Sequence, residues 1–169
     1  MNVLVLGDTH VPDFARALPL EQLSPHLEWA DVILHAGDAT SAAVLTELAE
    51  HAPVIAVAGN MDRPEVAAWG AQIEAQVELD GLSIAMVHDA GRRDGREHRL
   101  AQRFPSAGVI VFGHSHQPVN EEVDGVRYLN PGSPTWKRRA PEPTIIRLVV
   151  RAGRIDSCDL LALAPPGNS

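Results

Sequence analysis

Side chains that can bind metal ions stand at the ends of the apolar stretches of this sequence. Five such stretches end in Asp, Asn or His, and in four of them a glycine comes just before the polar residue. The side chains concerned are Asp8, His10, Asp38, Asn60, His88, His114 and His116. Oxygen and imidazole nitrogen ligands suit borderline divalent ions such as manganese, iron, cobalt, nickel and zinc. The pattern therefore indicates metal-assisted chemistry.

The size of this set bears on how many ions it holds. Seven ligands are more than one tetrahedral ion uses, so we predict two ions, with Asp38 bridging them from its central place in the order. Taken singly, each residue has an ordinary structural explanation, since an Asp or Asn after a strand is most often a turn or cap residue. Asp62 can cap a helix that begins at Pro64, and His35 fits a hydrogen-bonded core histidine. The metal hypothesis rests on all five strand ends together.

The apolar stretches have the length and composition of buried strands. Short runs rich in β-branched residues and bounded by turn residues occur at 3–6, 32–34, 54–57 and 109–112. Helices are predicted over 41–50 and 92–104, with further helix starts at Ser24-Pro25 and at Asp62. This alternation favours parallel strands joined by crossover helices, and such sheets bind ligands outside the carboxyl ends of their strands.

The second half of the sequence carries hairpin signals. Turns at Asp80-Gly81, Asp124-Gly125 and Gly153 each separate two strand-like runs. We therefore predict an α/β fold in which two β-sheets pack as a sandwich flanked by helices. A single domain is expected over 1–163, followed by a flexible C-terminal tail over 164–169. Residues 144–150 are a candidate edge strand.

Composition narrows the class of protein. The chain has 169 residues, of which 45% are hydrophobic and 21% charged, as in ordinary globular proteins. One cysteine, Cys158, excludes a disulfide framework and a thiolate metal cluster. A formal net charge of −8 argues against stable nucleic-acid binding. No apolar run approaches the roughly 20 residues that span a bilayer, and the N-terminus lacks a basic leader region. A cytoplasmic protein without membrane contact is expected.

The polar motifs also carry a family resemblance. Asp8-Thr9-His10, Gly37-Asp38, Gly59-Asn60-Met61-Asp62, His88 and Gly113-His114-Ser115-His116 resemble the motif set of the calcineurin-like metallophosphoesterases. The length and the segment Asn130-Pro131-Gly132-Ser133-Pro134 resemble the small prokaryotic YfcE-type phosphodiesterase branch. The resemblance implies an α/β/β/α sandwich. It also implies two metal sites, one formed by Asp8, His10, Asp38 and His116, and the other by Asp38, Asn60, His88 and His114.

The resemblance implies an activity as well. A dinuclear phosphodiesterase is expected, in which a hydroxide that bridges the metals attacks a small phosphorylated substrate and Asp38, Asn60 and His114 are catalytic. Manganese is the first expectation for the metal, with iron, cobalt, nickel, zinc or magnesium as alternatives. Phosphomonoesterase relatives place a proton-donating His directly after the motif Asn, whereas Met61 stands there in this chain and cannot donate a proton. This difference favours a diesterase.

Several alternatives stay open at the level of sequence. The same site suits a phosphomonoesterase or nucleotide pyrophosphatase, and the same fold suits a scaffold that recruits protein partners. Asp89 replaces the glycine of a family His-Gly-His motif and adds a carboxylate near the site. The segment Trp136-Lys137-Arg138-Arg139 is either a rim of the pocket or a surface loop, and a homo-oligomer is possible. One helical face is predicted to carry Arg92, Arg96, Arg99 and Arg103. Such a stripe is more typical of a solvated helix face than of a binding site for an acidic partner.

Overall fold

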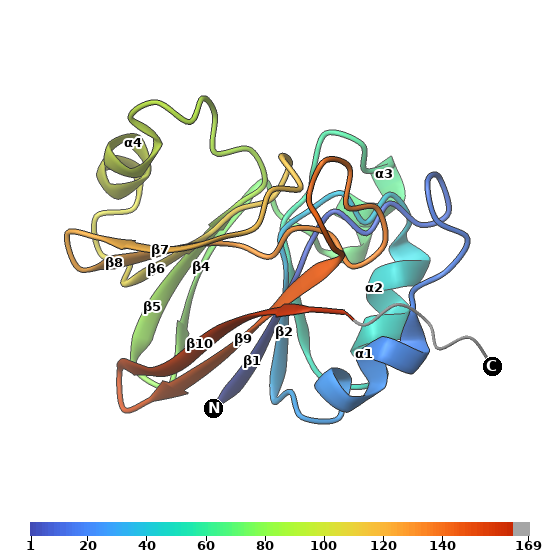
Figure 1. The fold of residues 1–169 in the computed structure, drawn as a ribbon, viewed down its shortest axis with the longest axis horizontal. Helices are drawn as coiled ribbons and strands as arrows, with labels where there is room; N and C mark the ends of the chain where they lie inside the picture. The colour runs from blue at the N-terminus through green and yellow to red at the C-terminus, as the bar shows by residue number, and fades with distance from the viewer. Residues whose placement is uncertain (164–169) are drawn as a thin grey trace.

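Two five-stranded β-sheets lie face to face in the computed structural model, which describes residues 1–163 (Figure 1). The first sheet contains β1 (Asn2–Leu6), β2 (Val32–His35), β3 (Val54–Ala56), β9 (Thr144–Arg151) and β10 (Arg154–Ala162), in the order β10-β9-β1-β2-β3. The second sheet contains β4 (Glu74–Leu79), β5 (Leu82–Val87), β6 (Val109–Val111), β7 (Val119–Val123) and β8 (Val126–Asn130), in the order β4-β5-β6-β8-β7. The predicted tail over 164–169 lies outside the described residues.

Alternation along the strands separates the buried side chains into layers. In β1, Val3 and Val5 belong to the cluster between the two sheets, whereas Leu4 and Leu6 belong to the cluster beneath the helices. Successive side chains of a strand point to opposite faces, so a strand buried on both faces is apolar throughout. This explains why the apolar runs of the first half are continuous rather than alternating.

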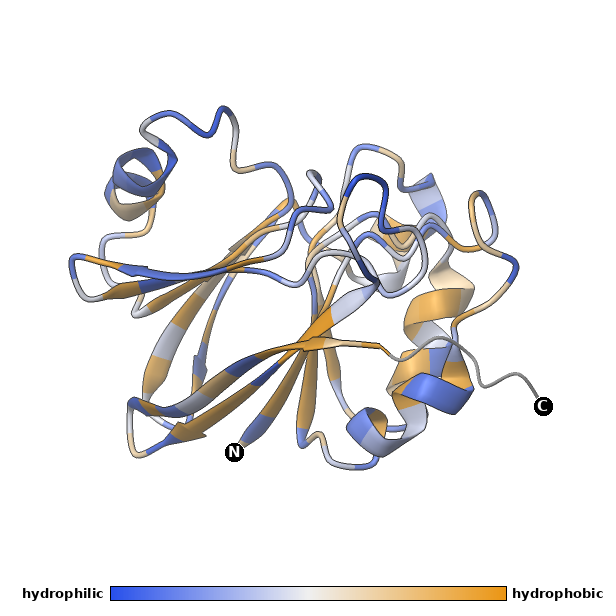
Figure 2. Ribbon diagram, viewed as in Figure 1, coloured by the Kyte–Doolittle hydropathy of each residue, from blue (hydrophilic) through white to orange (hydrophobic). Residues whose placement is uncertain are grey.

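Helices cover the outer faces of both sheets. The first sheet packs against α1 (Leu20–Leu27), α2 (Ala42–Ala49) and α3 (Pro64–Trp69), and the second packs against α4 (Arg96–Arg103) (Figure 1). Helix α4 is largely hydrophilic in Figure 2 and contributes Leu100 to the outer core of its sheet. The predicted α/β class and helix-flanked two-sheet sandwich are therefore confirmed.

Strand directions place the polar motifs at one edge of the sandwich. Strand β1 pairs in parallel with β2, and β2 with β3, while β5 pairs in parallel with β6, and β6 with β8. The segments that follow these parallel strands therefore leave each sheet on the same side. The three predicted hairpins are present as β4–β5, β7–β8 and β9–β10.

Three predictions about the bounds of helices and the place of a strand were wrong. Helix α1 begins at Leu20 and includes Pro25, because Leu23 and Leu27 bury one helical face that starts before Ser24. The predicted helix over 92–104 is shorter and begins only at Arg96. Gly91 and Gly95 adopt positive φ angles of 72° and 65°, so the backbone before Arg96 is not helical.

The third wrong prediction concerns the candidate edge strand over 144–150. Strand β9 lies inside the first sheet, between β10 and β1, and the longer hairpin partner β10 takes the edge. A separate expectation concerned membranes: among residues 1–163, no helix combines the length and the apolar character that crossing a bilayer requires.

Candidate metal centre

The sheet edge gathers the predicted metal ligands into two neighbouring groups. One group holds Asp8, His10 and His116, and the other holds Asp38, His88 and His114. Within each group the ligand atoms lie within 4.8 Å of one another. The segments after β1, β2, β5 and β6 supply these six side chains. The parallel strands thus bring together residues that are far apart in the sequence, such as His10 and His116, which are 106 positions apart.

The donor atoms of the first group point at one spot. His10 Nε2 and His116 Nε2 are 3.1 Å apart, and they lie 3.8 Å and 3.5 Å from Asp8 Oδ1. Asp8 Oδ2 is buried and has no hydrogen-bond partner among residues 1–163. A buried carboxylate and two converging imidazole nitrogens are costly without a cation between them. The donor set therefore fits a divalent metal ion.

The second group is joined to the first by Asp38. Asp38 Oδ2 lies 3.3 Å from His88 Nε2 and 3.6 Å from His10 Nε2, so this carboxylate stands between the groups. Asn60, the seventh predicted ligand, also belongs here, since its Oδ1 is 3.2 Å from His88 Nε2 and 2.9 Å from His114 Nδ1. All seven predicted side chains therefore meet at one place, with Asp38 central.

Backbone carbonyls orient two of the histidines. His88 Nδ1 lies 2.8 Å from the carbonyl oxygen of Ala36, and His116 Nδ1 contacts the carbonyl oxygen of Trp136. A ring nitrogen that donates its hydrogen to a carbonyl leaves the other nitrogen as a lone-pair ligand. Both rings are thereby held with Nε2 facing the carboxylates.

The backbone at the site is strained. Five predicted ligands have positive φ angles between 47° and 67°, namely Asp8, His10, Asp38, His114 and His116. A non-glycine residue in this region costs of order 1–3 kcal/mol, and such strain concentrates at functional sites. Gly59 leaves room for the carboxylate, because a Cβ atom on it would lie 2.1 Å from Asp38 Oδ1. The tight turns are thus what aims these side chains inward.

The two central groups of the second site have shifted pKa values. Burial alone would raise the pKa of Asp38, but the hydrogen bond and charge of His88 and the Met61 N–H outweigh it, so the pKa lies below the ordinary value. Burial would lower the pKa of His88, but the hydrogen bond to Asp38 and the charges of Asp38 and Asp8 raise it. Asp38 therefore remains an anion, as a metal ligand must.

Asp62 does not cap α3 as predicted; it joins two loops of the site. Residue Arg63 precedes the helix, with no side-chain capping bond. The Asp62 carboxylate instead accepts hydrogen bonds from the backbone N–H groups of Asp38, Thr40 and Gly59, at 3.1, 2.6 and 2.7 Å. Burial raises the pKa of Asp62, and these three donors oppose that effect. The carboxylate thus holds the turn that carries Asp38 against the turn that carries Asn60.

His35 lies beneath the centre as the expected hydrogen-bonded core histidine. Its ring is buried, with Nε2 3.2 Å from Thr9 Oγ1 and Nδ1 accepting from the N–H of Gly37 at 3.3 Å. Burial, with a further effect from His88, lowers the pKa of His35 to about 3. The residue is therefore neutral near neutral pH.

The remaining sequence features fall around the site. Met61 is 41% exposed, and Asp89 is exposed and accepts from the N–H of Gly91. The predicted arginine stripe is not one solvated face, because Arg96 is buried against Phe112. The segment after Ser133 is a rim of the site: Trp136 lies edge-on to both His10 and His116, at 5.2 Å between ring centroids.

Sequence reasoning missed several supporting residues. Phe14 stacks on Trp136 at 3.9 Å, and Asn130 donates to the carbonyl oxygen of Gly113 at 2.9 Å. Ser133 Oγ donates to the carbonyl oxygen of Asp8 at 2.8 Å. Of these, only Asn130 and Ser133 lay in a motif that the sequence singled out; an isolated Phe14 in a loop carries no comparable signal.

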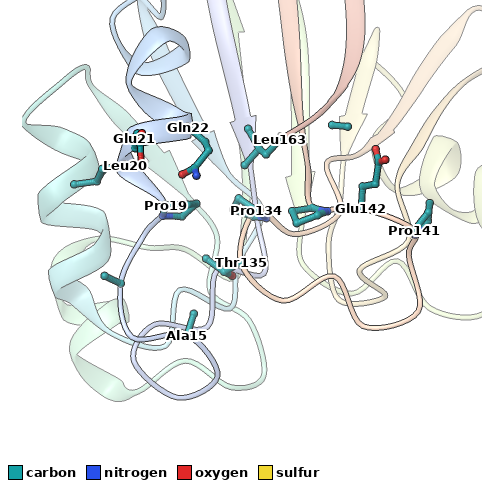
Figure 3. A pocket seen from close by; sticks show the side chains of 13 residues that line it. Ala15, Pro19, Leu20, Glu21, Gln22, Pro134, Thr135, Pro141, Glu142 and Leu163 are labelled. Atoms are coloured by element: carbon teal, nitrogen blue, oxygen red, sulfur yellow. The ribbon is translucent and has the colours of Figure 1, made fainter. Parts of the chain in front are cut away.

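A separate groove of about 890 Å³ lies between the segments 15–22 and 134–143 (Figure 3). Pro19, Leu20, Pro134 and Leu163 form much of its apolar wall, and Glu21 and Glu142 lie at its sides. None of the seven predicted ligands is among its lining residues in the described part of the chain. The groove is therefore distinct from the metal centre.

Two packed sheets with paired metal-ligand groups at one edge are the architecture of a metallophosphoesterase. The model of the calcineurin-like phosphoesterase superfamily domain matches residues 1–153, so the chain belongs to this superfamily and the resemblance is confirmed. A probable metallophosphoesterase from Methanothermobacter thermautotrophicus is 35% identical over 161 residues, which cover 93% of this chain and 90% of that protein.

Two further comparisons support the branch and the fold. A phosphodiesterase from Methanocaldococcus jannaschii is 28% identical over 148 residues, which cover 78% of this chain and 83% of that protein. The crystal structure of wild-type Vps29 complexed with Zn²⁺ from Entamoeba histolytica has a TM-score of 0.76 over 97% of this chain and 100% of that chain. At 22% identity, this last likeness concerns the fold alone.

The role of Asp62 can be tested by removing its carboxylate. Asp62→Ala leaves three backbone N–H groups without their acceptor and frees the turns of Asp38 and Asn60. Because supporting residues of this kind typically contribute 10- to 100-fold to metal affinity, we expect manganese affinity to fall about 10-fold or more. Isothermal titration calorimetry measures this change. Asp89→Ala removes an exposed carboxylate as a control, and an equal loss in both variants would contradict the role given to Asp62.

The pKa of His35 predicts acid sensitivity. The unfolded chain takes up a proton on His35 below about pH 6.5, whereas the folded protein stays neutral there down to about pH 3. The contribution of His35 to stability is therefore complete above pH 6.5 and is lost as the pH falls, by about 1.4 kcal/mol per pH unit. Urea unfolding of metal-free protein between pH 7 and pH 5 should show a shallower decline for His35→Gln than for the unchanged protein. Equal slopes would show that another group carries the effect.

Proposed function

We propose that this chain is a phosphodiesterase that uses two divalent metal ions to hydrolyse a small phosphorylated substrate. The observation that carries the proposal is the position of Asp38 between the two ligand groups, 3.3 Å from His88 Nε2 and 3.6 Å from His10 Nε2. A carboxylate placed in this way suits a pair of ions that share one ligand. Asp8, His10, Asp38 and His116 would hold the first ion, and Asp38, Asn60, His88 and His114 the second.

Bound ions of this kind activate water as a nucleophile and neutralise charge on the phosphate oxygens. The residues of the chain then position the reacting groups. Asn60 and His114 reach the accessible side of the second group, and their side chains contact each other at 2.9 Å. Asp38 is fixed from behind by the N–H of Met61 at 2.8 Å. We assign the catalytic roles to Asp38, Asn60 and His114. Manganese is the metal we propose.

Charge is compatible with an anionic substrate. The chain has a formal net charge of −8, but two dications would bring +4 to the sheet edge alone. The local field at the centre would then attract phosphate although the protein as a whole is acidic.

The choice of a diester rests on Met61. Met61 is 41% exposed, and its backbone N–H contacts Asp38 of the second group. A thioether cannot give a proton to a leaving group. General acid catalysis is typically worth about 10²–10⁴-fold, and its loss harms poor alkoxide leaving groups most. Diesters with acidic leaving groups depend on it least. The relative named a phosphodiesterase supports the same choice.

Matched chromogenic substrates test the proposal. Metal-stripped protein reloaded with manganese should hydrolyse bis-p-nitrophenyl phosphate faster than p-nitrophenyl phosphate. Asp38→Ala and His114→Ala should lose this turnover by two orders of magnitude or more, because each removes a proposed ligand. A preference for the monoester would defeat the argument from Met61. Metal binding without turnover of either ester would instead support a scaffold.

Met61→His tests the missing general acid directly. An imidazole at this exposed position supplies a titratable proton near the leaving group, so we expect monoester turnover to rise about 10-fold or more relative to diester turnover. Steady-state rates at equal manganese occupancy measure the ratio. Met61→Gln is the matched control, since it is polar but cannot act as an acid at neutral pH, and a rise as large as that of the His variant would refute the explanation.

A further inference from the structure

We propose that the outer face of Phe14 is a stacking subsite for a planar aromatic group of the substrate, such as a nucleobase esterified to the phosphate. This inference rests on the proposed phosphodiesterase function and specifies the class of its substrate. It starts from a short stack of side chains built beside the first ligand group from two loops that are far apart in sequence.

The stack has three layers, formed by Phe14, Trp136 and Arg138. The rings of Phe14 and Trp136 are nearly parallel, with centroids 3.9 Å apart and an interplanar angle of 11°. The guanidinium carbon of Arg138 lies 4.5 Å from the centroid of the Trp136 ring. Because Phe14 covers one face of the indole, Arg138 must cover the other. The face of Phe14 that points away from Trp136 is the aromatic face at which a ligand ring can join this stack.

The stack is fixed to the metal centre. The Phe14 ring lies edge-on to His10 at 5.5 Å between centroids, and Trp136 lies edge-on to His10 and His116 at 5.2 Å each. The N–H of Phe14 donates to the carbonyl oxygen of His10 at 2.9 Å, and that of Trp136 donates to Ser133 Oγ at 2.8 Å. Both rings thus hold a set position relative to the proposed ligands of the first ion.

The exposure of Phe14 completes the argument. Half of its surface, 50%, is open to solvent, although the Trp136 beneath it is partly buried. Single exposed aromatic side chains are common, but a ring braced from below and placed next to a ligand of the centre is pre-organised for stacking. Every nucleobase has a face that can stack on such a ring. A substituent on a phosphate bound at the centre has Phe14 within its reach.

Two diesters that share a leaving group test the subsite. Thymidine 5′-(p-nitrophenyl phosphate) and methyl p-nitrophenyl phosphate differ only in the nucleoside that replaces the methyl group. Stacking on an aromatic side chain typically changes binding by about fivefold to 100-fold. We therefore expect Phe14→Ala to lower the ratio of kcat/KM between the thymidine ester and the methyl ester at least about fivefold. Phe14→Leu should lower the ratio similarly, and Phe14→Tyr should keep it.

A control and a third substrate sharpen the outcome. Val123→Ala truncates an apolar side chain that is 38% exposed at the end of β7, and it should leave the ratio unchanged. Phenyl p-nitrophenyl phosphate separates two sources of the ring: a loss confined to the thymidine ester assigns the subsite to a nucleobase, and an equal loss for the phenyl ester assigns it to any aryl ester.

The result that overturns the inference is distinct from failure of the proposed function. An unchanged ratio in an active Phe14→Ala protein removes the subsite and leaves the phosphodiesterase in place. If manganese-loaded protein hydrolyses none of these esters, the proposed function fails, and calorimetric titration with thymidine 5′-monophosphate decides the subsite separately. Equal affinity of the unchanged protein and Phe14→Ala for this nucleotide overturns it, and at least fivefold weaker binding by the variant supports it.

Discussion

Two buried carboxylates, Asp8 and Asp38, set the requirement that the rest of the site meets. Anionic oxygen in a protein interior is costly unless hydrogen bonds and opposite charge surround it. The backbone supplies part of the required hydrogen bonding. The N–H of His114 donates to Asp8 at 3.2 Å, and that of Met61 donates to Asp38 at 2.8 Å. Other carboxylate oxygens lie near imidazole nitrogens, and Asp8 Oδ2 has no hydrogen-bond partner among residues 1–163. The arrangement suits a cation, and the strained turns around it are the cost of gathering these donor atoms.

The site depends on the packing of both sheets, because its residues come from segments of each. Each parallel strand delivers its following turn to the same edge, so residues from distant parts of the chain meet there. The second half then closes the edge through Ser133, which donates to the carbonyl oxygen of Asp8, and Thr135, which donates to that of Thr9. Because the same hydrogen bonds position the proposed ligands, metal binding would be coupled to folding.

The strand ends and their polar residues were predictable from the sequence, because apolar runs mark buried strands and parallel pairing sends their ends to one edge. That Asp62 joins two loops of the site, and does not cap a helix, was not predictable from the sequence. A cap is a local interaction, whereas the three N–H donors of Asp62 come from two turns whose approach exists only in the folded sandwich. Phe14 was missed for the same reason, since its partner Trp136 lies in another loop. Parallel strands can be inferred from pattern; contacts between loops cannot.

The central place of β1 in the first sheet affects when that sheet can form during synthesis. Strand β1 is synthesised well before its neighbour β9, so the sheet keeps an open edge at β1 until the β9–β10 hairpin is available. Pairings between such distant segments form slowly, and open edges invite association with other chains. The loop that holds Ser133 and Trp136 against the first ligand group directly precedes this hairpin. A nascent chain thus acquires the proposed ion-binding geometry only after this hairpin has been made.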